Sequence, residues 1–115
     1  MTTVPYVYRA DLVKIVDGDT IDADVSLGFH LRSVQRMRLL RINAPESKGE
    51  TREAGKAATA RLAELLAGKR LLVRTEKSDA FGRFLAEVIT VDADGRELNV
   101  NDEMLASGHA VPFRE

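Results

Sequence analysis

The chain has 115 residues, 44% of them hydrophobic and 30% charged, with a formal net charge of −1. This balance is typical of a globular protein with one modest core, and we expect residues 1–115 to form a single domain. No apolar run approaches the ~20 residues that cross a bilayer, so no membrane partner is expected. The near-neutral charge argues against a protein that coats nucleic acid, because non-specific affinity grows with the number of phosphates neutralised.

The absence of cysteine excludes disulfides and thiolate metal sites, and the two isolated histidines are too few for a zinc site. Any bound metal must therefore be held by oxygen ligands. Residues 1–5 have neither the basic nor the apolar region of a secretory signal. We therefore expect a cytoplasmic location, although a trimmed secreted precursor stays open as the alternative.

The first elements in chain order are strands. Residues 11–16 and 20–27 read as two strands joined by a turn near residue 18, and the second alternates apolar with polar side chains. Residues 34–43 carry apolar side chains at both parities, so this third strand is predicted to be covered on both faces. Arg38 lies inside it. Because a buried unpaired charge is costly, we expect Arg38 to face a carboxylate or a ligand phosphate.

A helix is predicted to begin near residue 47 and to end at Gly68. Ser47 and Glu50 have the spacing of a capping box, and Thr51 is a second N-cap candidate. Four apolar positions recur at helical spacing and are expected to face the core: Ala54, Ala58, Leu62 and Leu65.

Residues 71–76 and 84–91 read as two further strands. A tight turn at Gly95 follows, and Asn99 can cap a last helix over residues 100–107. About five strands are therefore predicted, with one helix after the third strand and another after the last. Periodicity alone indicates the α+β class and does not choose an architecture within it.

Basic residues gather locally in spite of the net charge. We read most of them as a solvated face, although such a local bias can also attract a nucleic-acid strand. The two clusters are Arg32, Arg36, Arg38 and Arg41, and Lys69, Arg70, Arg74 and Lys77.

Three short motifs carry the functional signal: Asp17-Gly18-Asp19-Thr20, the segment from Arg38 to Glu46, and the segment from Asp79 to Arg83. Their order and spacing resemble the staphylococcal nuclease (thermonuclease) family over about residues 13–110. The resemblance implies a five-stranded OB-fold, a Greek-key β-barrel with a helix between strands 3 and 4 and a short C-terminal helix. It also implies calcium-dependent hydrolysis of phosphodiester bonds in DNA and RNA with little sequence specificity.

The resemblance assigns a role to each residue that matches the family pattern. Asp19 would bind Ca²⁺ directly, and Asp17 would shape the outer shell. The side chain of Asn43 and the backbone carbonyl of Ala44 would complete the protein ligands to the metal. Asn43 departs from the pattern because the family commonly has aspartate there, and a neutral ligand should lower calcium affinity.

By the same resemblance, Arg38 and Arg83 would bind the scissile phosphate and Glu46 would orient or deprotonate the attacking water. Phe81 could stack on a base. Structural alternatives stay open: Arg38 as a buried salt bridge, Glu46 as an acid in the turn before the helix, and Arg83 as a surface arginine. The rival function is a catalytically silent OB-fold module that binds nucleic acid or a protein partner. As substrates we expect single-stranded or frayed DNA and RNA, acted on by a monomer.

Overall fold

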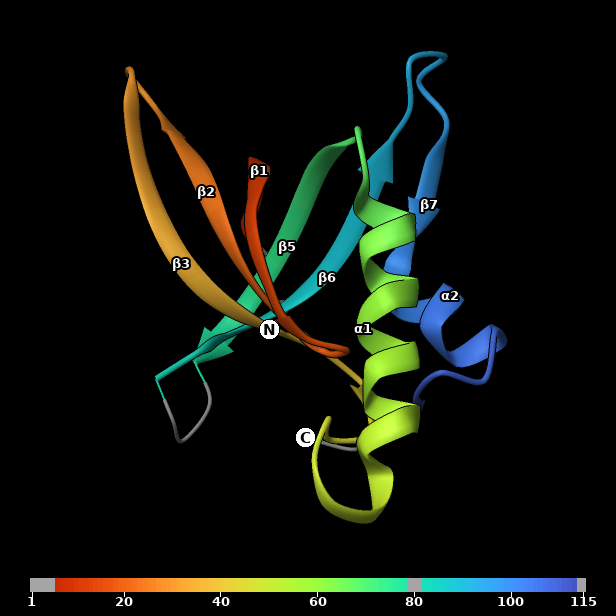
Figure 1. Cartoon of the computed structure of the whole chain (residues 1–115). Coiled ribbons are helices and arrows are strands. Elements are labelled where there is room, and N and C mark those ends of the chain that lie inside the picture. Colours follow the sequence, from red (N-terminus) through yellow and green to blue (C-terminus); the bar gives the residue numbers. More distant parts are fainter. Residues whose placement is uncertain (1–5, 79–81, 114–115) are drawn as a thin grey trace, which may run out of the picture.

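The computed structural model describes residues 6–78 and 82–113. Antiparallel pairing gives the strand order β3-β2-β1-β5-β6, and a parallel pairing of β3 with β6 closes the sheet into a barrel (Figure 1). The five barrel strands are β1 (Tyr6–Asp17), β2 (Thr20–Gly28), β3 (Leu31–Leu39), β5 (Arg70–Ser78) and β6 (Phe84–Val91). The predicted α+β class and five-stranded barrel are confirmed.

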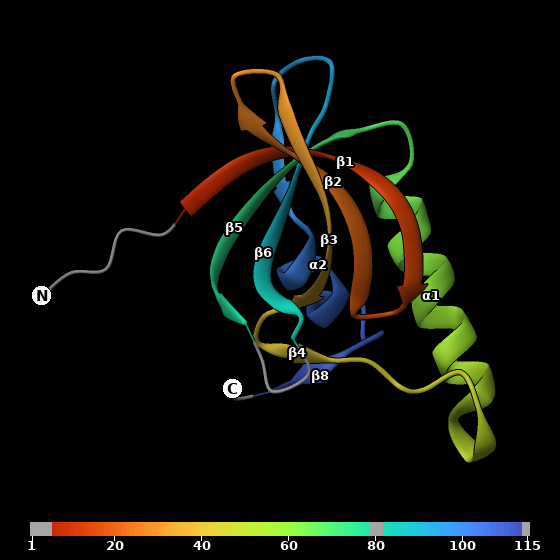
Figure 2. The ribbon, with the colours of Figure 1, turned by 90° about the vertical axis from the view of Figure 1, so that its left-hand side faces the viewer.

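The remaining elements sit around this barrel. A short strand, β7 (Glu97–Asn99), extends the sheet beyond β6, while β4 (Ile42–Asn43) pairs with β8 (Val111–Pro112). Both short strands of this second ladder lie at one end of the barrel, where β5 ends and β6 begins (Figure 2). The helices are η1 (Gly49–Thr51, a 3₁₀ turn), α1 (Arg52–Leu66) and α2 (Val100–Ala106).

Helix α1 comes between the third and fourth barrel strands in the chain, as predicted, and in space it lies beside β1 along one side of the barrel (Figure 2). Its buried face includes Ala58, Leu62 and Leu65, which confirms three of the four predicted core positions. Ala54 is exposed, and Gly55 is buried in its place. The apolar spacing alone does not reveal this, because Gly55 faces inward to admit backbone and not to bury a side chain.

The third strand is shorter than predicted, because the chain turns at Leu40 and Arg41 before β4 begins. Arg41 has a φ of 70°, a left-handed conformation that a non-glycine residue rarely adopts. The Leu40 N–H bonds the Ala86 carbonyl at 2.9 Å, which stabilises the start of the turn. A continuous apolar pattern over residues 34–43 therefore hides a turn.

The predicted capping box at Ser47 and Glu50 is wrong. No side chain caps the first turn, and the Thr51 hydroxyl instead donates to the carbonyls of Glu46 and Lys48. The predicted cap of the last helix is confirmed, since Asn99 Oδ1 accepts from the Asp102 N–H at 3.0 Å.

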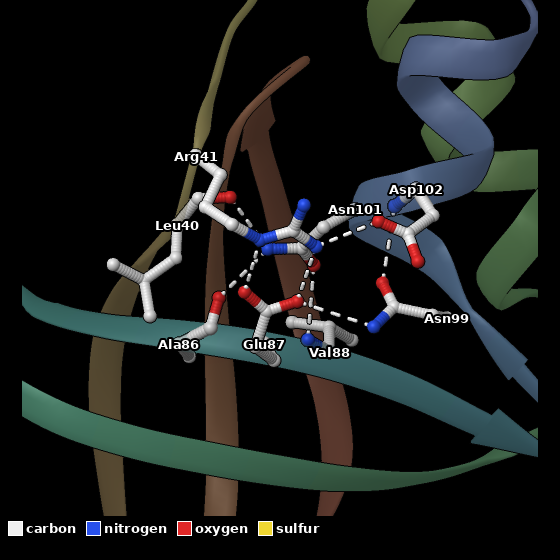
Figure 3. A network of polar contacts seen from close by, with 8 residues as sticks. All are labelled: Leu40, Arg41, Ala86, Glu87, Val88, Asn99, Asn101 and Asp102. Carbon is white, nitrogen blue, oxygen red and sulfur yellow. Dashed lines mark hydrogen bonds and ion pairs between the residues drawn. The ribbon is translucent and has the colours of Figure 1, made fainter. Parts of the chain in front are cut away.

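Asn101 of α2 ties the closing strand of the barrel to the turn after β3 (Figure 3). Its Nδ2 donates to the carbonyls of Leu40 at 2.9 Å and Ala86 at 3.0 Å, and its Oδ1 accepts from the Val88 N–H at 3.0 Å. The side chain is fully buried. One amide thus bonds three buried backbone groups, of which the Ala86 carbonyl also accepts from the Leu40 N–H.

Asn101→Ala should lower the free energy of unfolding by about 3 kcal/mol or more, because each orphaned buried polar group costs roughly 1–3 kcal/mol. Urea denaturation monitored by circular dichroism measures the change. Asn99→Ala is the control, and the loss of that cap together with the hydrogen bond from Asn99 to Glu87 should cost only about 1–2 kcal/mol. Equal losses in the two variants would contradict the proposed role of Asn101 in joining β6 to the turn after β3.

Candidate active site

The turn between β1 and β2 brings the first motif against the second. Asp19 Oδ2 accepts from the Ala44 N–H at 2.9 Å, and Asp19 Oδ1 accepts from the Thr20 hydroxyl at 3.0 Å. Gly18 makes this approach possible, since an added Cβ would lie 2.7 Å from the Ala58 Cβ and 2.8 Å from the Ala44 Cβ. The Asp-Gly-Asp sequence therefore serves close packing as well as the turn.

Asp17 supports the same turn, with its Oδ1 accepting from the Asp19 N–H at 3.1 Å. Burial raises the pKa of Asp17 above its usual value, and the neighbouring Asp19 carboxylate adds to the rise. The two carboxylates thus form one half-shielded acidic pair, which a cation would stabilise.

Arg38 is buried and faces the predicted carboxylate. Its Nη2 lies 3.8 Å from Asp19 Oδ2, and donates to the Ile42 carbonyl at 3.0 Å and to Asn43 Oδ1 at 3.2 Å. Oxygens from two separate motifs therefore converge on one cationic nitrogen.

Phe113 is a site residue that the sequence did not reveal. The Arg38 guanidinium lies over its ring at 4.8 Å from the centroid, and the Phe113 N–H bonds the Arg41 carbonyl at 2.7 Å. This cation–π contact covers the guanidinium from one side. An aromatic residue just after the short strand β8 carries no pattern that would mark it in advance.

Glu46 lies two residues after Ala44, with an exposed side chain and an anchored backbone. Its carbonyl accepts from the Thr51 hydroxyl at 2.7 Å. A Cβ on Gly55 would lie 2.4 Å from the Glu46 carbonyl, so only glycine lets α1 approach this closely. In residues 6–78 and 82–113 the Glu46 carboxylate makes no hydrogen bond or ion pair, which leaves it open to solvent.

Arg83 enters the neighbouring strand beside Arg38. It directly precedes β6, where Phe84 is in register with Met37 and Leu85 with Arg38. Phe81, the predicted stacking residue, lies outside the described residues. The structure thus brings Asp19, Arg38, Asn43 and Ala44 together, with Glu46 following in the chain and Arg83 directly before β6, the strand that pairs with β3 at Arg38.

Arg41 anchors the turn that leads to Asn43 (Figure 3). Its Nε and Nη2 donate to the two carboxylate oxygens of Glu87, each at 2.7 Å, and Nη2 also bonds Asp102 Oδ1 at 2.7 Å. Burial would raise the pKa of Glu87, but hydrogen bonds from Arg41 and Asn99 outweigh burial and hold it below its usual value. The network fixes the left-handed turn to both β6 and α2.

The donor set fits a hard cation with limited charge. The Asp19 carboxylate, the Asn43 amide oxygen and the Ala44 carbonyl are oxygen ligands of the kind calcium prefers, and water would have to supply the rest. Over the part of the chain that the structure describes, no three His, Cys, Asp or Glu side chains cluster as a metal site. Charge for a metal would therefore come from Asp19, with Asp17 behind it.

Comparison with known proteins decides the family. The model of the staphylococcal nuclease homologue family matches residues 36–115, a stretch that contains Arg38, Asn43, Glu46 and Arg83. The chain belongs to this family. The resemblance noted in the sequence is thereby confirmed.

Individual proteins also resemble the chain over most of its length. It is 35% identical to a protein named uncharacterized endonuclease in Escherichia coli O157:H7, over 90% of this chain and 60% of that protein. It is also 35% identical to a micrococcal nuclease of Shigella flexneri, over 93% of this chain and 59% of that protein. Protein ParB of Escherichia coli is 33% identical, over 92% of this chain and 58% of that protein. The chain thus spans about 60% of the length of these relatives.

The helices of residues 6–78 and 82–113 include none that combines the length and apolar character needed to cross a membrane.

Glu87→Gln should lower the free energy of unfolding by about 1–2 kcal/mol at pH 7, because it weakens charged hydrogen bonds to a half-exposed arginine. The pKa of Glu87 is lowered in the fold, so this stabilisation is present above its unfolded pKa of about 4.3 and is lost as the pH falls through the folded value. Urea titrations from pH 7 to pH 3 should show the two proteins converging. Glu64→Gln, which removes an exposed pair with Arg61, should change stability by less than about 0.5 kcal/mol throughout.

Proposed function

We propose that this chain is a calcium-dependent nuclease that hydrolyses phosphodiester bonds of DNA and RNA with little sequence specificity. The observation that carries the proposal is that side-chain oxygens of Asp19 and Asn43 both lie within 3.8 Å of Arg38 Nη2, at one end of the barrel. The exposed Glu46 stands next to this cluster in the chain. Relatives named endonuclease and micrococcal nuclease support the reaction class.

Each residue has a task in that reaction. Glu46 would orient or deprotonate the attacking water, for which an exposed carboxylate on an anchored backbone is suited. Arg38 and Arg83 would bind the scissile phosphate and stabilise the charge that develops on it. Arg38 must exchange part of its bonding to Ile42 and Asn43 for the phosphate, so substrate binding reorganises the turn.

Asp19, Asn43 and the Ala44 carbonyl would hold the calcium ion. When bound, the ion supplies positive charge beside the phosphoryl oxygens and lowers the pKa of its water. Asn43 Oδ1 already accepts from the positively charged Arg38 guanidinium at 3.2 Å. An amide at this position is therefore able to face a positive group.

A second function has two observations in its favour. The bonds of Arg38 described above are made within the protein itself, and position 43 is an amide where the family commonly has aspartate. Both features suit a catalytically silent OB-fold module that binds nucleic acid. Incubation of the pure protein with single-stranded DNA, with calcium and with chelator, separates the two functions, because only the nuclease yields chelator-sensitive fragments.

Glu46→Gln keeps the size of the side chain and removes its charge. Turnover on single-stranded DNA should fall at least ~100-fold, the usual contribution of a positioned acid or base, while thermal unfolding stays unchanged. Glu50→Gln is the matched control, since this exposed acid lies only four residues away in η1. Near-original turnover of Glu46→Gln would show that Glu46 merely precedes the helix.

Asn43→Asp adds one negative charge to the proposed metal ligands with almost no change in volume. Calcium affinity should rise by about tenfold or more, because ligand charge strongly tunes such sites. Calorimetric titration of both proteins measures it, and the calcium concentration for half-maximal cleavage should fall in parallel. Ala93→Asp adds the same charge on the exposed turn before β7 and should leave the calcium affinity unchanged. An unchanged affinity in Asn43→Asp would remove position 43 from the metal site.

A further inference from the structure

The arginines on the outer wall of the barrel fall into two groups. On β3, Arg32 binds Asp11 and Asp24 at 2.9 and 3.0 Å, and Arg36 binds Asp22 at 2.8 Å. Arg9 of β1 and two arginines of β5, Arg70 and Arg74, are exposed and form no ion pair with any residue that the structure describes. The three aspartates of β1 and β2 on this wall thus pair with the arginines of β3, and the second group of arginines takes part in none of these pairs.

Strand register places Arg9, Arg70 and Arg74 on one face. Arg9 is in register with Leu72, which lies between Arg70 and Arg74 on alternating positions of β5. Side chains directly opposite are about 5 Å apart at Cβ, and diagonal neighbours about 7–8 Å. Three guanidinium groups therefore surround the half-buried Leu72, an arrangement that repels itself unless an anion lies among them.

Arg9, Arg70 and Arg74 together form an arginine patch. A groove of about 570 Å³ begins at this patch. Among its lining residues are Arg9, Asp11, Arg32, Arg70 and Glu97. The lining holds three arginines and two acids, a surplus of one positive charge, and the Asp24 carboxylate that shares Arg32 with Asp11 is not part of the lining. The groove is therefore net positive, although the whole chain carries −1.

The patch leads toward the candidate active site. From Arg70 to Arg74 the strand advances about 13 Å, at roughly 3.3 Å per residue. Arg74 is in register with Glu87 of β6, and Arg38 is in register with Leu85 of the same strand, two residues away on the same face. With a strand spacing of about 4.8 Å, Arg74 lies roughly 12 Å from Arg38 along the wall. Figure 2 shows β5 running to the end of the barrel that carries β4 and β8.

We propose that Arg9, Arg70 and Arg74 bind the backbone phosphates of a single-stranded nucleic acid whose scissile phosphate lies at Arg38. The proposal rests on the proposed function and extends it to a substrate several nucleotides long. Guanidinium groups bind phosphates through paired hydrogen bonds, and Leu72 offers an apolar surface to the sugars between them. A nucleic-acid strand several nucleotides long suits an OB-fold, because such folds bind about 4–16 nucleotides.

The test measures binding without cleavage. Fluorescence anisotropy of a labelled twelve-residue oligothymidylate, in excess chelator, gives the Kd of the native protein and of Arg70→Gln/Arg74→Gln. The double variant should bind about tenfold more weakly at about 50 mM salt, and the slope of log affinity against log salt should shrink by about 1.4, or about 0.7 per lost phosphate contact. Arg9→Gln alone should shrink it by about 0.7.

Matched variants separate this patch from general charge. Lys56→Gln/Arg96→Gln removes the same charge from exposed positions on α1 and before β7, and should leave the Kd within twofold. Arg70→Lys/Arg74→Lys keeps the charge and should restore most of the binding.

The proposal would be overturned if Lys56→Gln/Arg96→Gln weakened binding as much as Arg70→Gln/Arg74→Gln, or if Arg70→Gln/Arg74→Gln did not weaken binding. The proposal would also be overturned if Arg70→Lys/Arg74→Lys bound the oligonucleotide no better than Arg70→Gln/Arg74→Gln. Failure of the proposed function looks different: the native protein would bind the long oligonucleotide through the patch and cleave nothing when calcium is added.

Discussion

The bond from the Ala44 N–H to the Asp19 carboxylate is the contact on which the site depends. It joins the turn after β1 to the segment after β4, two stretches 25 residues apart in the chain. Gly18 lets the backbones approach closely enough to make it. With Asp19 fixed in this way, its carboxylate can face Arg38, so the first two motifs act as one structural unit and not as two independent loops.

Arg38 couples that unit to the closure of the barrel. It sits where β3 pairs with β6, and its bonds to the Ile42 carbonyl and Asn43 hold the chain just after the turn. A buried guanidinium tolerates this position only because oxygens surround it, and those oxygens are in turn oriented by the guanidinium. Arg41 performs the complementary task from outside by binding the same turn to Glu87 and Asp102. The geometry of Asn43 is therefore determined by two arginines on opposite sides of one short segment.

Much of the fold could be predicted because local chemistry dictated it. Asn99 caps α2, Gly68 takes a left-handed φ after α1, and the strand over residues 84–91 matches its predicted bounds. The break at Arg41 could not be predicted, since tertiary bonds and not its own propensity hold its left-handed backbone. Gly55 was overlooked for a related reason: its role is to admit the Glu46 backbone, which spacing along a helix does not encode. Phe113 depends on β4–β8 pairing, a contact made across the whole chain.

The net charge of −1 conceals three distinct environments for arginine. Arg38 is buried among backbone oxygens, Arg36 is neutralised by an aspartate on the neighbouring strand, and Arg70 stands exposed with no ion pair to the part of the chain that the structure describes. The first environment shapes the site and the second is worth little to stability, because exposed ion pairs rarely contribute more than about 1 kcal/mol. The ion pairs of this second environment instead cancel positive charge on the part of the wall that β2 and β3 form. Since attraction for a polyanion follows local and not total charge, pairing on β2 and β3 directs any bound strand to β1 and β5, along the side that ends beside Arg38.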